Sequence, residues 1–300
     1  MVWIHTFELM CYGIVAVMLT DLIRRRDYNS LFTFGSAALV GFVMELLAVA
    51  VTDIYYYNPH FYLNIGSVPK QFPVFGGFMW GGLTVYGIKL AQKLKWDRIR
   101  TSLMAGMFIV TMDILLDVVA IRLDGGFWVW VGKEISLGID QHTFMSVIWV
   151  NFLGYMIETP TVVWLTLRKR EKISETDWKR QTGHMFLIAL LAILVTAVGS
   201  LIALGLNALT DDWFACAAFV LLWGVLMVML VRRCIALRLR IKKPAHWNWP
   251  MLIFWAAMYI YCLIALCTLG IHISAPWFIV CGILFAASTL YMAAAGPNGL

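Results

Sequence analysis

Long apolar runs recur along this chain, separated by short polar segments. Several of them exceed about 18 residues, the length of helix that crosses a hydrocarbon layer roughly 30 Å thick. Backbone groups in lipid must be satisfied within the spanning segment, and the alternating pattern of barrel strands is absent. We therefore predict an all-α, polytopic membrane bundle of about nine transmembrane helices. The predicted spans are residues 2–23, 31–53, 72–94, 102–122, 143–167, 184–207, 211–231, 249–270 and 275–295.

Composition agrees with this class. Of the 300 residues, 62% are hydrophobic and 13% are charged, whereas soluble domains carry roughly a quarter charged residues. The first apolar run has its positive charges after it and lacks a small-residue cleavage site, so we interpret it as a span and not a signal peptide. The six cysteines show no CxxC spacing, which disfavours a disulfide framework or a zinc site and favours small core residues.

Basic residues are distributed unevenly between the two ends of the predicted spans. Twenty of the 23 Lys and Arg lie in segments 24–26, 89–100, 168–180 and 232–243. The positive-inside rule then places the N-terminus outside and the C-terminus in the cytoplasm of a multi-pass cell-membrane protein. The net charge of +6 is explained by this topology and by contact with anionic membrane lipids, so no nucleic-acid partner is needed.

A polar segment at 168–182 divides the chain into two halves. Residues 1–167 contain five predicted spans and nearly all of the polar residues inside spans. Residues 183–300 contain four predicted spans with almost none. We interpret 1–167 as the catalytic half, 168–182 as a cytoplasmic loop and 183–300 as a supporting half.

Acidic and amide side chains inside the apolar runs are the main candidates for function, because a charge at the membrane centre costs at least about 2.5 kcal/mol. Asp113 and Asp117 are four residues apart and share one helix face. At about 1.5 Å of rise per residue, they lie roughly 18 and 24 Å from the cytoplasmic end of their span, and Glu45 and Asn151 lie roughly 12 Å below the outer surface. These depths predict a polar chamber in the outer half of the membrane.

Two aromatic segments, 54–70 and 125–132, are expected to lie above this chamber. Tyr and Trp often form belts at membrane interfaces, and the alternative is that some of these rings line or cover an apolar cavity. Trp80 lies too deep in its span for a belt. The residues predicted to bind a substrate are Tyr55, Tyr57, Trp80, Trp128, Trp130, Tyr155 and Glu158.

The pair of aspartates suggests acid chemistry. Burial and a neighbouring charge each favour the protonated form of a carboxyl group, so the pair is expected to hold one proton and to titrate as a unit. A protonated carboxyl in an aromatic cavity can add its proton to an alkene, and aromatic faces stabilise the resulting tertiary carbocation. Water would convert this cation to an alcohol, and an internal alkene would convert it to a ring. A helix-packing network or a proton relay is the other explanation.

An ordered set of short motifs resembles a known family. The motifs are "GFVMELLAV" with Glu45, "YYY" at 55–57, "GSVP" at 66–69, Trp80, "MDILLD" with Asp113 and Asp117, "GFWVW" at 126–130 and "NFLGY" at 151–155. Over residues 40–165 the chain resembles the membrane carotenoid-biosynthesis family that includes the prokaryotic carotenoid 1,2-hydratases, among them those of the bacterioruberin pathway. The tryptophan before the first aspartate of the family is Met112 here, and the proline after the second is Val118.

The resemblance implies a hydratase of the prokaryotic plasma membrane that takes a hydrophobic isoprenoid from the lipid phase. Asp113 or Asp117 would be the acid, and Glu45 and Asn151 would position water or hold the partner carboxyl group. We expect neither a metal nor an organic cofactor. The sequence does not indicate an oligomeric state.

Two other functions stay open at this point. A membrane terpene cyclase started by protonation would use the same acids, and one started by diphosphate loss would need Mg²⁺ held by Asp113, Asp117, Asn151 and Glu158. The second route is weaker, because few cations lie near the chamber to neutralise a diphosphate. A proton-coupled transporter would use buried carboxyl groups as a relay, although no inverted repeat is visible. Histidine pairs at HxxH or HxxxH spacing are absent, which disfavours a di-iron desaturase.

Overall fold

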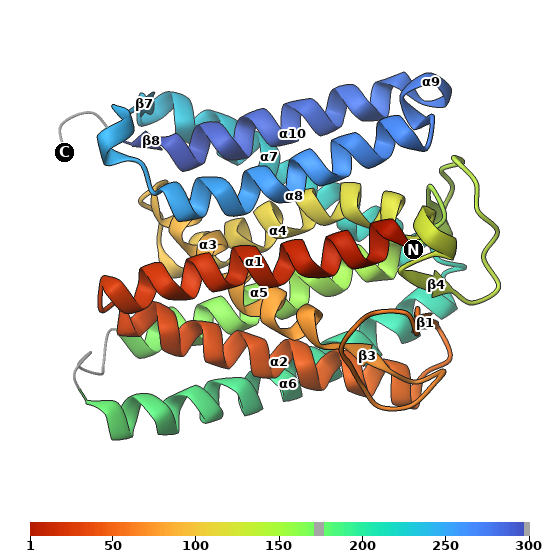
Figure 1. Ribbon diagram of the computed structural model, residues 1–300, viewed down its shortest axis with the longest axis horizontal. Helices are drawn as coiled ribbons and strands as arrows, with labels where there is room; N and C mark the ends of the chain where they lie inside the picture. The colour runs from red at the N-terminus through yellow and green to blue at the C-terminus, as the bar shows by residue number, and fades with distance from the viewer. Residues whose placement is uncertain (171–176, 297–300) are drawn as a thin grey trace.

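The computed structural model describes residues 1–170 and 177–296, and helices dominate it (Figure 1). Within these ranges lie nine helices of 19 to 32 residues and one of four residues. They are α1 (Val2–Arg24), α2 (Tyr28–Val51), α3 (Val74–Gln92), α4 (Arg98–Ala120), α5 (Trp149–Arg170), α6 (Trp178–Leu209), α7 (Trp213–Ala236), α8 (Trp249–Thr268), α9 (Ile271–Ser274) and α10 (Pro276–Ala294).

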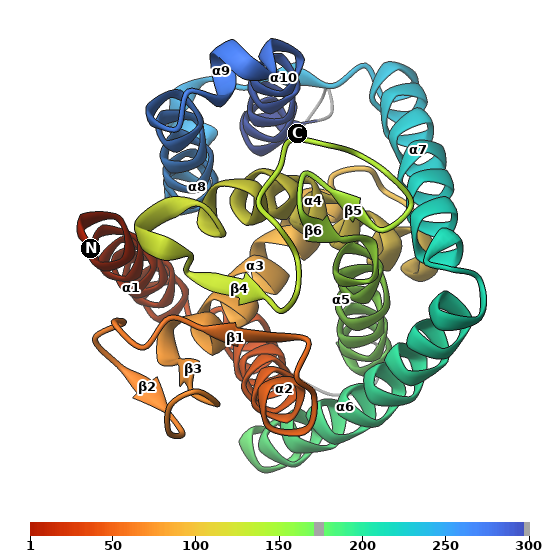
Figure 2. The ribbon, with the colours of Figure 1, turned by 90° about the vertical axis from the view of Figure 1, so that its right-hand side faces the viewer.

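Seven of these helices are long and apolar enough to cross a membrane, namely α1, α2, α4, α6, α7, α8 and α10. The protein is therefore an all-α, polytopic membrane bundle, as the apolar runs predict. The other two long helices, α3 and α5, lie inside the bundle beside α4, and the remaining helices surround them (Figure 2). Polar residues such as Asn151 and Glu158 lower the hydropathy of α5. Nine spans and an external N-terminus stay predictions.

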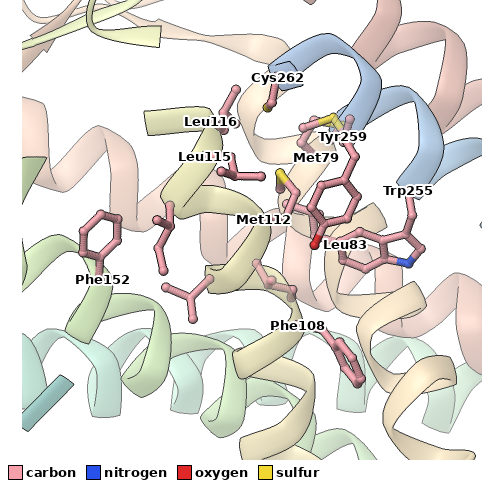
Figure 3. Packing of buried hydrophobic residues seen from close by; sticks show 14 of the residues in the cluster. Met79, Leu83, Phe108, Met112, Leu115, Leu116, Phe152, Trp255, Tyr259 and Cys262 are labelled. Carbon is pink, nitrogen blue, oxygen red and sulfur yellow. The ribbon is translucent and has the colours of Figure 1, made fainter. Parts of the chain in front are cut away.

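The central helix of the bundle is α4. Within its most apolar stretch 89% of the residues are buried, against 28% for α6 and 22% for α7, so α4 supplies core and the other two helices face outward. Figure 3 shows α4 side chains packing between residues of α3, α5 and α8. The labelled residues are Phe108, Met112, Leu115 and Leu116 of α4, Met79 and Leu83 of α3, Phe152 of α5, and Trp255, Tyr259 and Cys262 of α8.

Glycines of α3 allow it to pack closely against α2. A Cβ atom added at Gly77 would lie 2.4 Å from Cδ2 of Phe42, and one added at Gly81 would lie 2.6 Å from Cδ2 of Phe34. Helices in membranes associate through such close contacts, because burial of apolar surface is not a driving force in lipid. The contact fixes the position of Glu45, on α2, relative to α3.

Short antiparallel strand pairs lie at both ends of the bundle. At the end that holds the N-terminus (Figure 1), β1 (Tyr55–Tyr57) pairs with β4 (Trp128–Trp130), β2 (Asn64–Ile65) with β3 (Phe72–Pro73), and β5 (Thr143–Phe144) with β6 (Val147–Ile148). At the opposite end, β7 (Arg240–Ile241) pairs with β8 (Ala295–Gly296). Single 3-10 turns occur at Leu123–Gly125 and Pro244–His246.

The fifth predicted span begins later than the sequence indicated. Residues 143–148 form the β5–β6 hairpin and α5 begins only at Trp149. Met145 and Ser146 in this hairpin have φ angles of +50° and +71°, which a helix does not accept. The apolar residues of 143–148 thus belong to a hairpin that packs on the bundle.

The segment between the two helices is shorter in the structure than the predicted loop at 168–182. The basic end of α5 stays helical as far as Arg170, and α6 begins at Trp178. The Asp177 side chain caps α6 by accepting a hydrogen bond from the amide of Arg180. Residues 171–176 of the predicted loop lie outside the described residues.

Lys93, directly after α3, is predicted to anchor the end of α10. Its Nζ donates to the carbonyl oxygens of Met292, Ala293 and Ala295 at 2.8, 2.6 and 2.9 Å. Because hydrogen bonds from charged donors contribute about 1.5–3 kcal/mol, Lys93→Met should lower the free energy of unfolding by about that amount. Thermal unfolding followed by tryptophan fluorescence measures the change. The exposed Lys95→Met is the matched control, and equal unfolding midpoints for the two variants would contradict the anchor.

Candidate active site

The β1–β4 pair covers the end of the inner helices (Figure 2). Its register places Tyr55 opposite Trp130 and Tyr57 opposite Trp128, and alternate residues of a strand point to the same face. Asn58 fixes the pair by donating from Nδ2 to the carbonyl oxygen of Gly126 at 2.8 Å. The two aromatic segments that the sequence singled out are therefore joined to each other over the helix ends.

Glu45 of α2 accepts hydrogen bonds from three of the predicted site residues. The hydroxyls of Tyr55 and Tyr57 donate to its Oε2 at 2.5 and 2.9 Å. The indole Nε1 of Trp80 donates to its Oε1 at 3.4 Å. Burial, and next the charge of Glu45, raise the pKa of both tyrosines, so their hydroxyls stay protonated and act as donors. Glu45 thus links β1 to α2 and α3.

Asp117 of α4 has a donor on each carboxyl oxygen. Nε1 of Trp128 donates to Oδ1 at 2.8 Å, and Nδ2 of Asn151 donates to Oδ2 at 2.5 Å. The side chain is 2% exposed. In this geometry both oxygens of Asp117 act as hydrogen-bond acceptors.

Asp113, one turn earlier on α4, has a different environment although it is equally buried. The hydroxyl of Tyr155 donates to its Oδ1 at 3.0 Å. Its Oδ2 has no hydrogen-bond partner among the described residues. Buried polar atoms are bonded in the great majority of cases, so Oδ2 of Asp113 is where the site has an unused hydrogen-bonding position.

An aromatic stack connects the Glu45 and Asp113 centres. The rings of Trp80 and Tyr155 stack with centroids 4.8 Å apart, and each ring hydrogen-bonds to one of the two acids. Gly41 of α2 makes room for Trp80, because a Cβ atom there would lie 2.4 Å from Cδ1 of that ring.

Gly41→Ala is expected to displace Trp80 and to impair the site. Overpacking of this kind costs about 1–3 kcal/mol, and a displaced ring loses its hydrogen bond to Glu45 and its stack on Tyr155. Product formation should change, and so should the fluorescence of Trp80. The Trp80 signal is obtained by subtracting the fluorescence of a matching protein that carries Trp80→Phe. Gly13→Ala is the matched control, because a Cβ atom at Gly13 meets nothing within 4 Å. An unaltered site in Gly41→Ala would refute this role of the glycine.

A cavity of about 70 Å³ lies between these groups. Its polar lining is made of residues that the sequence singled out, namely Glu45, Tyr57, Trp80, Asp113, Trp128 and Tyr155. The apolar lining was missed at the sequence level and includes Phe7, Phe72, Phe75, Met79, Leu83, Leu116 and Met258. Phe72 and Phe75 lie in the segment "QFPVFGGF", whose glycine pair is a weak signal, and nothing in the sequence marks Met258.

Five predicted site residues do not line this cavity, namely Tyr55, Asp117, Trp130, Asn151 and Glu158. Tyr55, Trp130 and Asn151 line a neighbouring one, although Tyr55 and Asn151 are bonded to acids of the site. Glu158 is 8% exposed, and its Oε1 has no partner among the described residues. Over the described part of the chain, no group of three or more His, Cys, Asp or Glu is arranged to hold a metal ion.

Comparison with known proteins places the chain in a family. A family model described as carotenoid biosynthesis protein matches residues 5–227. The chain belongs to this family. The match contains all of the predicted site residues and ends within α7, and no curated protein or solved structure matches the chain. The family resemblance of the motifs is thus confirmed, and the protein has a role in carotenoid biosynthesis.

Proposed function

We propose that this membrane protein is an isoprenoid hydratase, which protonates the terminal alkene of an acyclic carotenoid and adds water. The observation that carries the proposal is the contrast between the two aspartates. Asp117 has a donor on each oxygen, whereas Asp113 lines the cavity and its Oδ2 has no partner among the described residues. This contrast favours Asp113 as the proton donor and Asp117 as its ionised partner.

In the first step, the O–H bond of Asp113 breaks and its proton forms a C–H bond with the less substituted alkene carbon. The alkene π electrons make this bond, and the positive charge is left on the tertiary carbon. Ring faces attract a cation through their quadrupole, and Trp80, Trp128 and Tyr155 line the cavity. The aromatic lining would therefore lower the energy of the intermediate.

In the second step, the oxygen of a water molecule bonds to the cation, and the proton that this water loses goes to the Asp117 carboxylate. Proton transfer from Asp117 to Asp113 then restores the starting state. The sum is alkene plus water giving a tertiary alcohol, with no change of oxidation state. General acid–base steps of this kind contribute about 10²- to 10⁴-fold to rates.

The size of the cavity is consistent with recognition of one end of a long chain. One water needs roughly 10–15 Å³ by this measure of volume, and the cavity has about 70 Å³. It thus has space for a branched terminal unit, and the rest of the isoprenoid would extend into the lipid phase.

The test is a comparison of carotenoids from cells that make lycopene, with and without this protein. The expected product is heavier by one water and carries a tertiary hydroxyl group. A cyclised product of unchanged mass would refute hydration in favour of cyclisation. Movement of unaltered lycopene across the membrane, with no product, would refute an enzyme in favour of a carrier.

A further inference from the structure

A second cavity lies behind the hydrogen bonds of the site. It has a volume of about 120 Å³ and is lined by Tyr55, Trp130, Asn151 and Gly154 on one side and by Ser200 and Ala203 of α6 on the other. Tyr55 donates to Glu45, which lines the first cavity, and Asn151 donates to Asp117. The Tyr55–Glu45 pair therefore stands between the two cavities, and Asn151 links the second cavity to Asp117.

A third cavity, of about 240 Å³, adjoins the second and is lined in part by the loop residues Lys133, His142 and Asp212. The two share five lining residues, Ile54, Trp130, Ile148, Val150 and Leu204. The third cavity is also lined by four polar side chains that line neither of the other two cavities, those of Lys133, His142, Asn207 and Asp212.

The polar mouth of this third cavity is ordered and open to solvent. Nδ1 of His142 lies 2.8 Å from Oδ2 of Asp212, and Nδ2 of Asn207 donates to Oδ1 of Asp212 at 2.5 Å. The side chains of His142 and Asp212 are 38% and 33% exposed. Water thus has hydrogen-bonding partners at the solvent end of the two joined cavities, and Asn151 supplies a partner at their inner end.

We propose that these two cavities form a water route, which brings the water that adds to the alkene to Asn151 and Asp117 separately from the isoprenoid chain. This inference rests on the proposed hydratase function. In the route, Asn151 meets the incoming water beside Asp117. The water oxygen bonds to the tertiary cation, and its proton goes to the Asp117 carboxylate.

Separate routes have a chemical advantage. The first cavity is lined mostly by apolar side chains and takes the alkene, and water inside it would lie against the ring faces that stabilise the cation. Delivery through the Asn151 side keeps this cavity dry until the cation has formed. The middle of the route is formed by the five shared residues, four of them aliphatic, so it offers water few hydrogen-bonding partners.

Gly154→Leu tests the route by filling its inner part. A Cβ atom at Gly154 meets nothing within 4 Å, and the residue lines the second cavity, so a larger side chain can enter the cavity from this position. Ser200→Leu fills the same cavity from α6. Gly205→Leu is the matched control, because a Cβ atom there also meets nothing within 4 Å and the residue lines none of the three cavities.

Purified variants in lipid nanodiscs are incubated with lycopene in deuterated water, and product and recovered substrate are analysed by mass spectrometry. Both filling variants should form the alcohol at least about tenfold more slowly than wild type. The recovered lycopene should still gain deuterium, because a cation that meets no water loses a proton to the Asp113 carboxylate and returns to an alkene. Gly205→Leu should behave like wild type.

Wild-type rates of alcohol formation in Gly154→Leu and Ser200→Leu would overturn the route. Loss of deuterium uptake together with alcohol formation would also overturn it, because these residues would then act on protonation and not on water supply. Failure of the hydratase proposal is distinguishable from failure of the water route, because in that case the wild-type protein itself would form no alcohol.

Discussion

Asp113→Asn is expected to slow alcohol formation from lycopene by about 10²- to 10⁴-fold, the usual contribution of a general acid. Asparagine preserves the shape of the side chain, and its amide oxygen can still accept the hydrogen bond from Tyr155. It has no acidic proton to give to an alkene. Deuterium uptake into recovered lycopene should therefore fall together with alcohol formation, and both are measured with purified protein in nanodiscs.

The matched control is Asp53→Asn. Asp53 follows α2, is 89% exposed and pairs with Lys70 at 3.4 Å, so its amide variant should hydrate lycopene at the wild-type rate. Undiminished hydration by Asp113→Asn would contradict the acid assignment. A fall in the thermal midpoint that accompanied the loss of activity would assign Asp113 a structural role instead.

Asp117→Asn is expected to slow alcohol formation by about 10²-fold or more, because the proton acceptor for water is lost. Its effect on deuterium uptake should differ from that of Asp113→Asn. Protonation of the alkene by Asp113 does not require Asp117 as a base, so recovered lycopene should still gain deuterium. The ratio of uptake to alcohol formation, measured in one reaction, separates the two aspartates.

A side-chain exchange separates chemistry from packing at Asp117. With asparagine at 117, Trp128 and Asn151 both present donors to a group that has one acceptor oxygen. The double variant Asp117→Asn with Asn151→Asp restores donor–acceptor pairing and moves the carboxylate to α5. It should recover the thermal midpoint of the wild type but not its hydration rate. Recovery of both would show that the position of the carboxylate is unimportant and would refute the assigned role of Asp117.

Helical periodicity and depth account for the part of the site that sequence could predict. Asp113 and Asp117 fall on one face of α4, and Asn151 and Tyr155 fall on one face of α5 at matching depth. The hydrogen bonds between these faces follow from two adjacent helices at that depth. The apolar runs similarly determine the helices, because a run longer than the hydrocarbon layer has few alternatives.

Contacts between distant loops and differences between like residues could not be predicted. The pairing of β1 with β4 joins segments about 70 residues apart, and no local pattern encodes it. Asp113 and Asp117 are the same residue type on the same helix face, so only their neighbours distinguish them. Met258 lines the cavity because α8 packs on α4, which apolar patterning does not specify.

The most direct test of the account is the fate of isotopic labels from solvent. Purified wild-type protein would be incubated with lycopene in water that carries both deuterium and heavy oxygen. Protonation by Asp113 followed by water capture predicts an alcohol with heavy oxygen on the tertiary carbon and one deuterium fixed on the neighbouring carbon. A deuterated product without heavy oxygen, or no product at all, would contradict hydration as the reaction of this protein.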